Sequence, residues 1–248
     1  MERLLQASNY HNSSRRGEGV SEVQGWGDRD LNRLSYVLIV EGNTELFYIQ
    51  YLKDNSKLNF DIRPFNGTVK KGWKIESGMV CMCGDGFSVE NYNDLKNSMD
   101  CEMRPKVICI FDLDKCIENA TIFKKYKELL QEKLNDKRKF DYYFCTSLPS
   151  IEYWFLLHYP QFNDKTFYKK IKSCNSIATE ISKDKNITFL KSAKAKEWFD
   201  MLCEDEYLNR AKERAEAKAN HSNRLDKVSN PSDCDISYSD LYKLFEIK

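Results

Sequence analysis

The sequence has no long apolar stretch. No run approaches the ~18 consecutive apolar residues that a membrane-spanning helix needs, and the first 30 residues are polar and charged, unlike a secretory signal. We therefore expect a cytoplasmic protein with no membrane association. The 248 residues are enough for one large domain or for one and a half.

Histidine is scarce, and the cysteines are not spaced as metal ligands. The chain has three histidines and nine cysteines, and no two cysteines form a C-x-x-C pair. Cys81 and Cys83 form a C-x-C, but no histidine lies near them, so the four spaced ligands of a structural zinc site are missing. Cys109 and Cys145 lie inside apolar runs, where a thiol is expected to be buried. The absence of an export signal indicates reduced thiols, as in the cytoplasm.

The chain also lacks a net charge of either sign. Its 39 basic and 38 acidic residues give a net charge of +1. This balance neither predicts nor excludes a nucleic-acid partner, because local patches matter more than the sum. The sequence is 41% hydrophobic and 13% aromatic, which is enough for a real core and argues against disorder. We therefore expect a folded globular protein.

Apolar strands alternate with helices from residue 35 to residue 147. In SYVLIV, at 35–40, the apolar residues do not alternate with polar ones, which is typical of a strand buried on both faces. Further strands are predicted at 58–65, 107–111 and 140–147, and helices within 41–55, at 88–99 and at 121–134. This alternation predicts an α/β fold with a mainly parallel sheet flanked by helices.

The sequence predicts three parts of the chain. Residues 1–33 are expected to be a flexible arm, and residues 34–160 to hold the sheet and the catalytic residues. Residues 161–248 are expected to form a helical C-terminal extension packed on that domain, with a strong helix at 206–220 and a terminal helix. Residues 66–87 fit either a hairpin insertion or a further strand.

Two of the predicted strands end in acidic residues. Asp112 and Asp114 follow the apolar run 107–111, and Glu41 follows SYVLIV directly. Ligands in open parallel sheets bind beyond the carboxyl ends of the strands, so these carboxylates converge if the two strands are neighbours. Hard oxygen ligands of this kind suit Mg²⁺ or Mn²⁺. The alternative interpretation is that each acid belongs to an ordinary turn, where Asp is common.

Several segments resemble a known family. VLIVEGNTELFYIQYL followed by VICIFDLD resembles a Toprim domain, the metal-dependent module of topoisomerases, primases and some nucleases. LPSIEYWFLLHY, a later FLK, LNRAKERAEAK and NPSDCDISYSDLYKLF resemble, in the same order, segments of RloB-like proteins. These are a Toprim family encoded beside ATPases in bacterial restriction and abortive-infection loci. The resemblance covers roughly residues 35–248.

The resemblance implies a Mg²⁺-dependent nuclease acting in defence against phage, with Mn²⁺ as the other candidate metal. It implies that Glu41, Asp112 and Asp114 bind the metal and carry the catalysis, with Glu152 as a further ligand. It also implies that Lys191 neutralises charge in the transition state. An ATPase partner and a nucleic-acid substrate follow from the same resemblance. RNA, for instance a transfer RNA, and DNA both stay open, as does a homo-oligomeric state.

Some of these residues have ordinary alternatives. Glu152 lies in a predicted buried helix at 149–159, where it could simply pair with a lysine, although an acid is costly to bury unpaired. Lys191 could belong to a solvated basic face. His158 is expected to be a satisfied core histidine. Glu45 is expected in the first turn of a helix, where the macrodipole favours an acid.

The sequence departs from the family in places. DLD stands where the family often has DRD, so a charge that could meet phosphate is missing there, and phosphate contacts are left to the lysines. LPSIE replaces the usual Asn-Pro-Cys-Phe-Glu. The lysines of 165–196 lie among aromatic residues such as Phe167 and Tyr168, which suits single-stranded nucleic acid. The alternative is a helix with its polar face in water.

Two other functions stay open. IFDLDKC resembles the first motif of haloacid-dehalogenase-type phosphatases, in which the first Asp, here Asp112, is the nucleophile. However, Cys116 stands where Thr or Val is usual, and Glu41 is left without a role. The other function is non-catalytic, with the fold kept as a docking or sensor subunit of an ATPase partner.

Overall fold

The computed structural model describes residues 34–83, 88–98, 106–135, 142–160, 162 and 196–247. The expected flexible arm at 1–33, most of the lysine-rich segment and Lys191 lie outside these residues. Within the described part of the chain, no helix is long and apolar enough to span a membrane.

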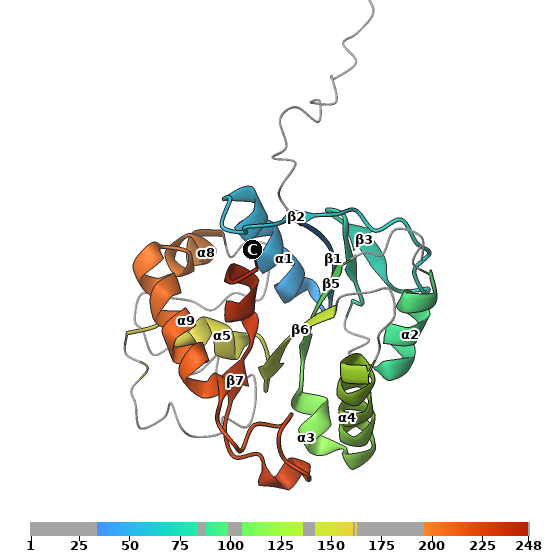
Figure 1. The fold of residues 1–248 in the computed structure, drawn as a ribbon. Helices are drawn as coiled ribbons and strands as arrows, with labels where there is room; N and C mark the ends of the chain where they lie inside the picture. Colours follow the sequence, from blue (N-terminus) through green and yellow to red (C-terminus); the bar gives the residue numbers. More distant parts are fainter. Residues whose placement is uncertain are drawn as a thin grey trace, which may run out of the picture. The chain divides into compact units, whose positions relative to one another are not determined.

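A sheet of seven strands forms the centre of the fold (Figure 1). Its order is β3-β4-β1-β5-β6-β7, and β2 also pairs with β1. The strands are β1 (Ser35–Val40), β2 (Asp61–Ile62), β3 (Lys74–Glu76), β4 (Met79–Cys81), β5 (Lys106–Asp112), β6 (Tyr142–Leu148) and β7 (Tyr238–Ser239). All pairs among β2, β4, β1, β5 and β6 are parallel, whereas the outer strands β3 and β7 are antiparallel to their neighbours. The predicted α/β fold with a mainly parallel sheet is thus confirmed.

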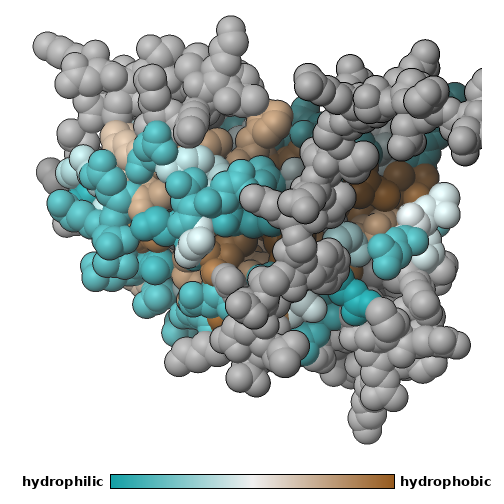
Figure 2. All heavy atoms as spheres, turned by 90° about the horizontal axis from the view of Figure 1, so that it is seen from above, coloured by the Kyte–Doolittle hydropathy of each residue, from teal (hydrophilic) through white to brown (hydrophobic). Residues whose placement is uncertain are grey.

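Helices cover both faces of the sheet, because the central strands are apolar on both faces. Alternate residues of β1 and β5 belong to two separate hydrophobic clusters. One cluster contains α1 (Asn43–Asp54), α5 (Glu152–Leu157), α8 (Lys196–Leu202), α9 (Asp205–Ala219) and the 3₁₀ helix η3 (Leu241–Phe245). The other contains α2 (Val89–Ser98), α3 (Asp114–Glu118) and α4 (Ala120–Asn135). On the face drawn in Figure 2, hydrophilic residues cover much of the outside and hydrophobic residues lie deeper.

The strand order reverses at β1. The chain runs from β1 through α1 to β4 on one side of β1, and then through α2 to β5 on its other side. The helices α1 and α2 belong to opposite faces of the sheet. In open α/β sheets, such a reversal leaves a crevice at the carboxyl ends of the two central strands, where ligands bind. Glu41 and Asp112 lie at these strand ends.

Two elements differ from their sequence-based prediction, and at 66–87 the structure shows the hairpin that was one of the two alternatives. The expected strand at 58–65 is reduced to the two residues of β2. The segment 66–87 contains the β3–β4 hairpin, joined by Ser77 and Gly78, which both have positive φ as a tight two-residue hairpin turn requires. The predicted helix at 149–159 is shorter: α5 begins at Glu152, and a cis peptide bond joins Leu148 to Pro149 before it.

The C-terminal segment is less helical than predicted. α9 confirms the predicted helix at 206–220, and its small and apolar stripe of Leu208, Ala211 and Ala215 is buried. After it, however, β7 joins the sheet, and the predicted terminal helix is the short 3₁₀ helix η3. β7 pairs with β6 through Ser239 and Ser147, whose buried hydroxyls lie 2.8 Å apart. The polar serines of this stretch are thus used by the sheet, which the sequence pattern did not indicate.

Candidate functional site

Glu41 and Asp112 are joined across two neighbouring strands. β1 and β5 are in register with Val40 opposite Ile110, and the N–H of Glu41 continues the ladder by donating to the carbonyl oxygen of Ile110 at 3.1 Å. One residue beyond, the N–H of Asp112 donates to Oε2 of Glu41 at 2.8 Å. The structure therefore brings these two predicted site residues into direct contact.

The turn after β6 holds the carboxylate of Asp112. The N–H of Ile151 donates to Oδ1 of Asp112 at 2.8 Å. The N–H of Leu113 donates to the carbonyl oxygens of Ser147, at 2.9 Å, and Pro149, at 3.3 Å. The end of β5 is thereby tied to the turn that leads into α5, so the segment carrying Glu152 is fixed beside Asp112.

Glu45 lies in the same cluster. It stands in the first turn of α1, as predicted, and its Oε2 accepts a 3.0 Å hydrogen bond from the N–H of Gly42. A Cβ atom at position 42 would lie only 3.1 Å from that oxygen, so glycine leaves the space that the carboxylate uses. Glu45 is only 4% exposed. An acid that only interacts with the helix dipole in a first turn can stay in water, so its place in the helix does not explain this burial.

Glu152 is, with Glu45, one of the two fully buried acids of the site. It is 3% exposed, and its Oε2 accepts a 2.5 Å hydrogen bond from the hydroxyl of Ser150. Its negative charge acts on both Glu45 and Asp112. The structure therefore places Glu152 with the predicted metal ligands.

Burial and mutual repulsion shift the protonation of the cluster. Burial, and then the charges of Glu45, Glu41, Glu152 and Asp114, raise the pKa of Asp112 well above its usual value. Burial raises the pKa of Glu45 to about 7, with the charges of Glu41 and Glu152 adding to the effect. Acids that raise one another's pKa in this way share one negative field, which a cation would relieve.

The donor set fits a divalent metal in its chemistry but is not arranged as a finished metal site. Among the described residues, no three His, Cys, Asp or Glu side chains stand together closely enough to hold an ion as they are. The carboxylates instead accept hydrogen bonds from N–H and O–H groups. The hydrogen bonds from Ile151 and Gly42 fall on one oxygen of each carboxylate, Oδ1 of Asp112 and Oε2 of Glu45, and carboxylate oxygens are the ligands that a hard cation takes.

Asp114 also belongs to this cluster, because its negative charge acts on Asp112. Asp114 is exposed, and its Oδ1 accepts a 2.6 Å hydrogen bond from the N–H of Lys115. Leu113, which stands where the family often has an arginine, is fully buried and carries no charge. Lys115 supplies a positive charge instead, because its Nζ is 3.9 Å from Oε1 of Glu41. Lys191 lies outside the described residues.

Arginines of α9 hold the far end of α5. Arg214 donates to the carbonyl oxygens of Leu157, at 2.9 Å, and Tyr159, at 2.7 Å. Arg210 donates to the carbonyl oxygen of His158 at 3.0 Å. Cations at a helix C-terminus satisfy its last carbonyl groups and favour its dipole. α9 therefore fixes the helix whose first residue is Glu152.

His158 is a buried core residue, as predicted, but it is only half satisfied. Its Nδ1 is 2.9 Å from the carbonyl oxygen of Trp154, and Nε2 has no hydrogen-bond partner among the residues that the structure describes. Burial lowers its pKa to about 3. The side chain is therefore neutral at physiological pH, and it packs edge-on against the ring of Trp154.

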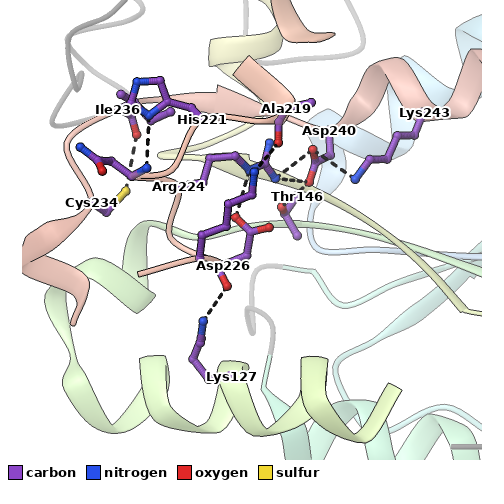
Figure 3. A network of polar contacts seen from close by, with 12 residues as sticks. Lys127, Thr146, Ala219, His221, Arg224, Asp226, Cys234, Ile236, Asp240 and Lys243 are labelled. Carbon is purple, nitrogen blue, oxygen red and sulfur yellow. Dashed lines mark hydrogen bonds and ion pairs between the residues drawn. The ribbon is translucent and has the colours of Figure 1, made fainter. Parts of the chain in front are cut away.

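A buried ion pair anchors the C-terminal segment next to the site (Figure 3). Nη2 of Arg224 donates to both carboxylate oxygens of Asp240, at 3.1 and 2.9 Å, and the hydroxyl of Thr146 in β6 donates to Oδ2 at 3.1 Å. The guanidinium also lies 3.8 Å from the ring centroid of Tyr238 in β7. This clamp, Arg224–Asp240–Thr146, fixes β7 beside the last residues of β6, directly before the turn that contacts Asp112.

Sequence reasoning undervalued some of these groups. The full burial of Glu45 depends on Gly42 and on the packing of α1, and its only signal in the sequence is an acid four residues after Glu41. The N–H of Ile151 carries no side-chain signal at all. Lys115 directly follows D-x-D, so its position in the sequence could have indicated a positive charge beside the acids.

One comparison with known proteins is informative. No curated protein and no solved structure matches the chain significantly. A family model described as RloB-like protein matches residues 36–246, which is most of the chain and includes all the acids of the site. The chain therefore belongs to the RloB-like family.

Proposed function

We propose that this protein is a metal-dependent nuclease of Toprim type that hydrolyses phosphodiester bonds. The observation that carries the proposal is the convergence of Glu41, Glu45, Asp112 and Glu152 at the carboxyl ends of β1 and β5. Gathering buried acids at one point costs stability, and such perturbed carboxylates are characteristic of functional sites. The crevice at a strand-order reversal is also where α/β folds bind their ligands.

In this proposal the acids divide the work. Glu41, Asp112, Asp114 and Glu152 would hold Mg²⁺ or Mn²⁺, which when bound would polarise the phosphate and lower the pKa of a water. Glu45, which is buried beside these residues and is not one of the proposed ligands, would accept a proton from the attacking water. The N–H of Ile151 holds Asp112 in place.

We also propose a biological setting. Membership of the RloB-like family supports a role in bacterial defence against phage, in the cytoplasm, with an ATPase partner that restrains or triggers the activity. An unrestrained nuclease would damage its host, which makes such control plausible. RNA, including transfer RNA, and DNA are both candidate substrates.

The proposal is tested by incubating the purified full chain with labelled transfer RNA, plasmid and single-stranded DNA. Each reaction contains Mg²⁺, Mn²⁺ or a chelator, with and without the proposed ATPase partner. We expect cleavage that requires the metal and is lost in Asp112→Asn but kept in Glu118→Gln, a control at an exposed acid of α3. No metal-dependent cleavage under any condition would instead support the docking role.

The phosphatase alternative predicts a different product. A phosphatase using Asp112 as nucleophile would form an aspartyl-phosphate, which a phosphate analogue such as beryllium fluoride would trap on that side chain. A metal-dependent nuclease of the proposed kind forms no such intermediate. Mass spectrometry of the chain after incubation with a phosphomonoester distinguishes the two.

A further inference from the structure

Two thiols stand side by side at the end of β4. The Sγ atoms of Cys81 and Cys83 are 3.9 Å apart, and the thiol of Cys83 also lies 3.6 Å from the carbonyl oxygen of Cys81. Residues two apart in an extended strand share a face but are separated by about 6.6 Å along it. Cys83 has a left-handed backbone, with φ 52°, which ends the strand and turns its thiol back onto Cys81.

The two thiols differ in accessibility. Cys83 is exposed and Cys81 is fully buried. Among the cysteines that the structure describes, Cys83 is the one exposed thiol; the buried ones are Cys81, Cys109, Cys116, Cys145, Cys203 and Cys234. An oxidant in solution therefore reaches this pair through Cys83 first, and the partner thiol is already beside it.

A lysine of the neighbouring strand lies beside the pair. Lys74 of β3 lies directly opposite Cys81 in the hairpin, and its positive charge acts on the thiols. Burial raises the pKa of Cys81 to about 11, so Cys81 is the protonated member of the pair at neutral pH.

We propose that Cys81 and Cys83 form a dithiol–disulfide site that low-molecular-weight disulfides oxidise. The Cys83 thiolate attacks the small disulfide, forming a mixed disulfide and releasing one small thiol. Cys81 then loses its proton and attacks the sulfur of Cys83, which closes the intrachain bond and releases the second small thiol. The two electrons lost by the protein pass to the small disulfide, which takes up the two protons as it becomes two thiols.

The site lies one strand away from the acidic cluster. Cys81 is opposite Val40 in the β1–β4 pairing, and the N–H of Met82 donates to the carbonyl oxygen of Val40 at 3.0 Å. Closing the bond shortens the sulfur–sulfur distance to about 2.0 Å. Since Cys81 is held in the sheet, Cys83 is the residue that moves. This chemistry does not depend on the nuclease activity proposed above.

The experiment treats the reduced full chain with oxidised glutathione, unfolds it in the presence of N-ethylmaleimide to block every free thiol, and maps tryptic peptides by mass spectrometry. The peptide 75–96, between Lys74 and Lys96, contains Cys81 and Cys83 as its only cysteines. We expect this peptide to become two hydrogens lighter and its maleimide labelling to fall at least tenfold. In Cys83→Ser, we expect Cys81 to stay a free thiol that is labelled after unfolding.

Two results would overturn the proposal. One is a lasting glutathione adduct on Cys83 with Cys81 still free, which would show that the pair does not close. The other is a peptide that carries two maleimide groups after the same treatment, which would show that the pair does not react. Both results are read from the unmutated chain, so neither depends on the folding of a variant.

Discussion

The N–H of Asp112 donates a 2.8 Å hydrogen bond to the carboxylate of Glu41, 71 residues earlier in the chain. This contact crosses from one central strand to the next at the point where the strand order reverses. A backbone group of one acidic segment thus positions the side chain of the other. The two segments cannot be displaced independently, and the consequences can be measured.

Divalent cations should stabilise the protein through this cluster. At a concentration 100 times its Kd, a bound ion adds about 2.7 kcal/mol to the free energy of unfolding, which for a chain of this size raises Tm by roughly 5–10 °C. We expect Mg²⁺ or Mn²⁺ to give such a shift in a thermal unfolding assay and Asp112→Asn to abolish it. Asn keeps an oxygen to accept the N–H of Ile151, so the fold is preserved. An equal shift in the variant would show that the ion binds elsewhere.

Glu45 should weaken the fold as pH rises. Its pKa is about 7 in the folded protein against 4.5 in an ordinary glutamate, so the folded state binds the proton more tightly than the unfolded state. The stability that this proton contributes is complete below pH 4.5 and is lost as pH rises through 7. In the presence of a chelator, we expect Glu45→Gln to gain stability relative to the unmutated protein between pH 4.5 and 7.5, by a few kcal/mol at most.

Urea unfolding at several pH values measures this gain. Glu213→Gln, at an exposed acid of α9, is the control and should show no comparable gain. If the difference in stability between Glu45→Gln and the unmutated protein stays constant across this range, the carboxylate of Glu45 does not carry a raised pKa.

His158 should act in the opposite direction. Its pKa is about 3 when folded against 6.5 for an ordinary histidine, so its contribution is complete above pH 6.5 and is lost as pH falls towards 3. The loss is at most about 1.4 kcal/mol per pH unit. We expect His158→Asn to be less stable than the unmutated protein at pH 7.5, because packing is lost, and to show a shallower loss below pH 6.5. Phe155→Leu, which changes no titrating group, should keep the original slope in urea unfolding.

Removing one partner of the Arg224–Asp240 ion pair should lower the free energy of unfolding more than expected from replacing both partners with apolar residues. Arg224 and Asp240 are 3% and 5% exposed, so removing one partner leaves the other charged and buried. We expect Arg224→Met and Asp240→Leu each to lose about 3–5 kcal/mol of unfolding free energy, and the double variant to lose less than the sum. Lys243→Ala is the matched control, because Lys243 contacts Asp240 from a side chain that is 42% exposed and should cost less than about 1 kcal/mol. Strict additivity in this cycle would contradict the coupling.

The sequence predicts the centre of the fold well and its margins poorly. β1 and β5 are uninterrupted apolar runs that need no partner to be identified, and the acids at their ends follow from the parallel arrangement. β7 is different, because the two residues Tyr238 and Ser239 have no strand pattern of their own. They form a strand by pairing with β6, and the Arg224–Asp240 ion pair holds them there. α5 is shorter than predicted because the turn before it bonds to Asp112 and Leu113, a tertiary contact that local propensity does not contain.

The same limit applies to the candidate site. The predicted acids Glu41, Asp112 and Glu152 are brought together by the sheet, whereas the burial of Glu45 depends on how α1 packs. Periodicity assigns Glu45 to a helix but does not say whether the first turn of that helix faces water or other carboxylates. Such information is encoded in contacts distant along the chain.

The two outermost strands have a consequence for solubility. A long open strand edge invites pairing with the edge of another molecule, which leads to aggregation. In this sheet the buried, β-branched strands lie inside, while β3 and β7 at the margins are three and two residues long. β3 also carries Lys74 and Glu76, which form an ion pair at 2.5 Å. These short outer strands give a second copy of the chain little backbone to pair with. The central strands that carry the acids are therefore protected from edge-to-edge association.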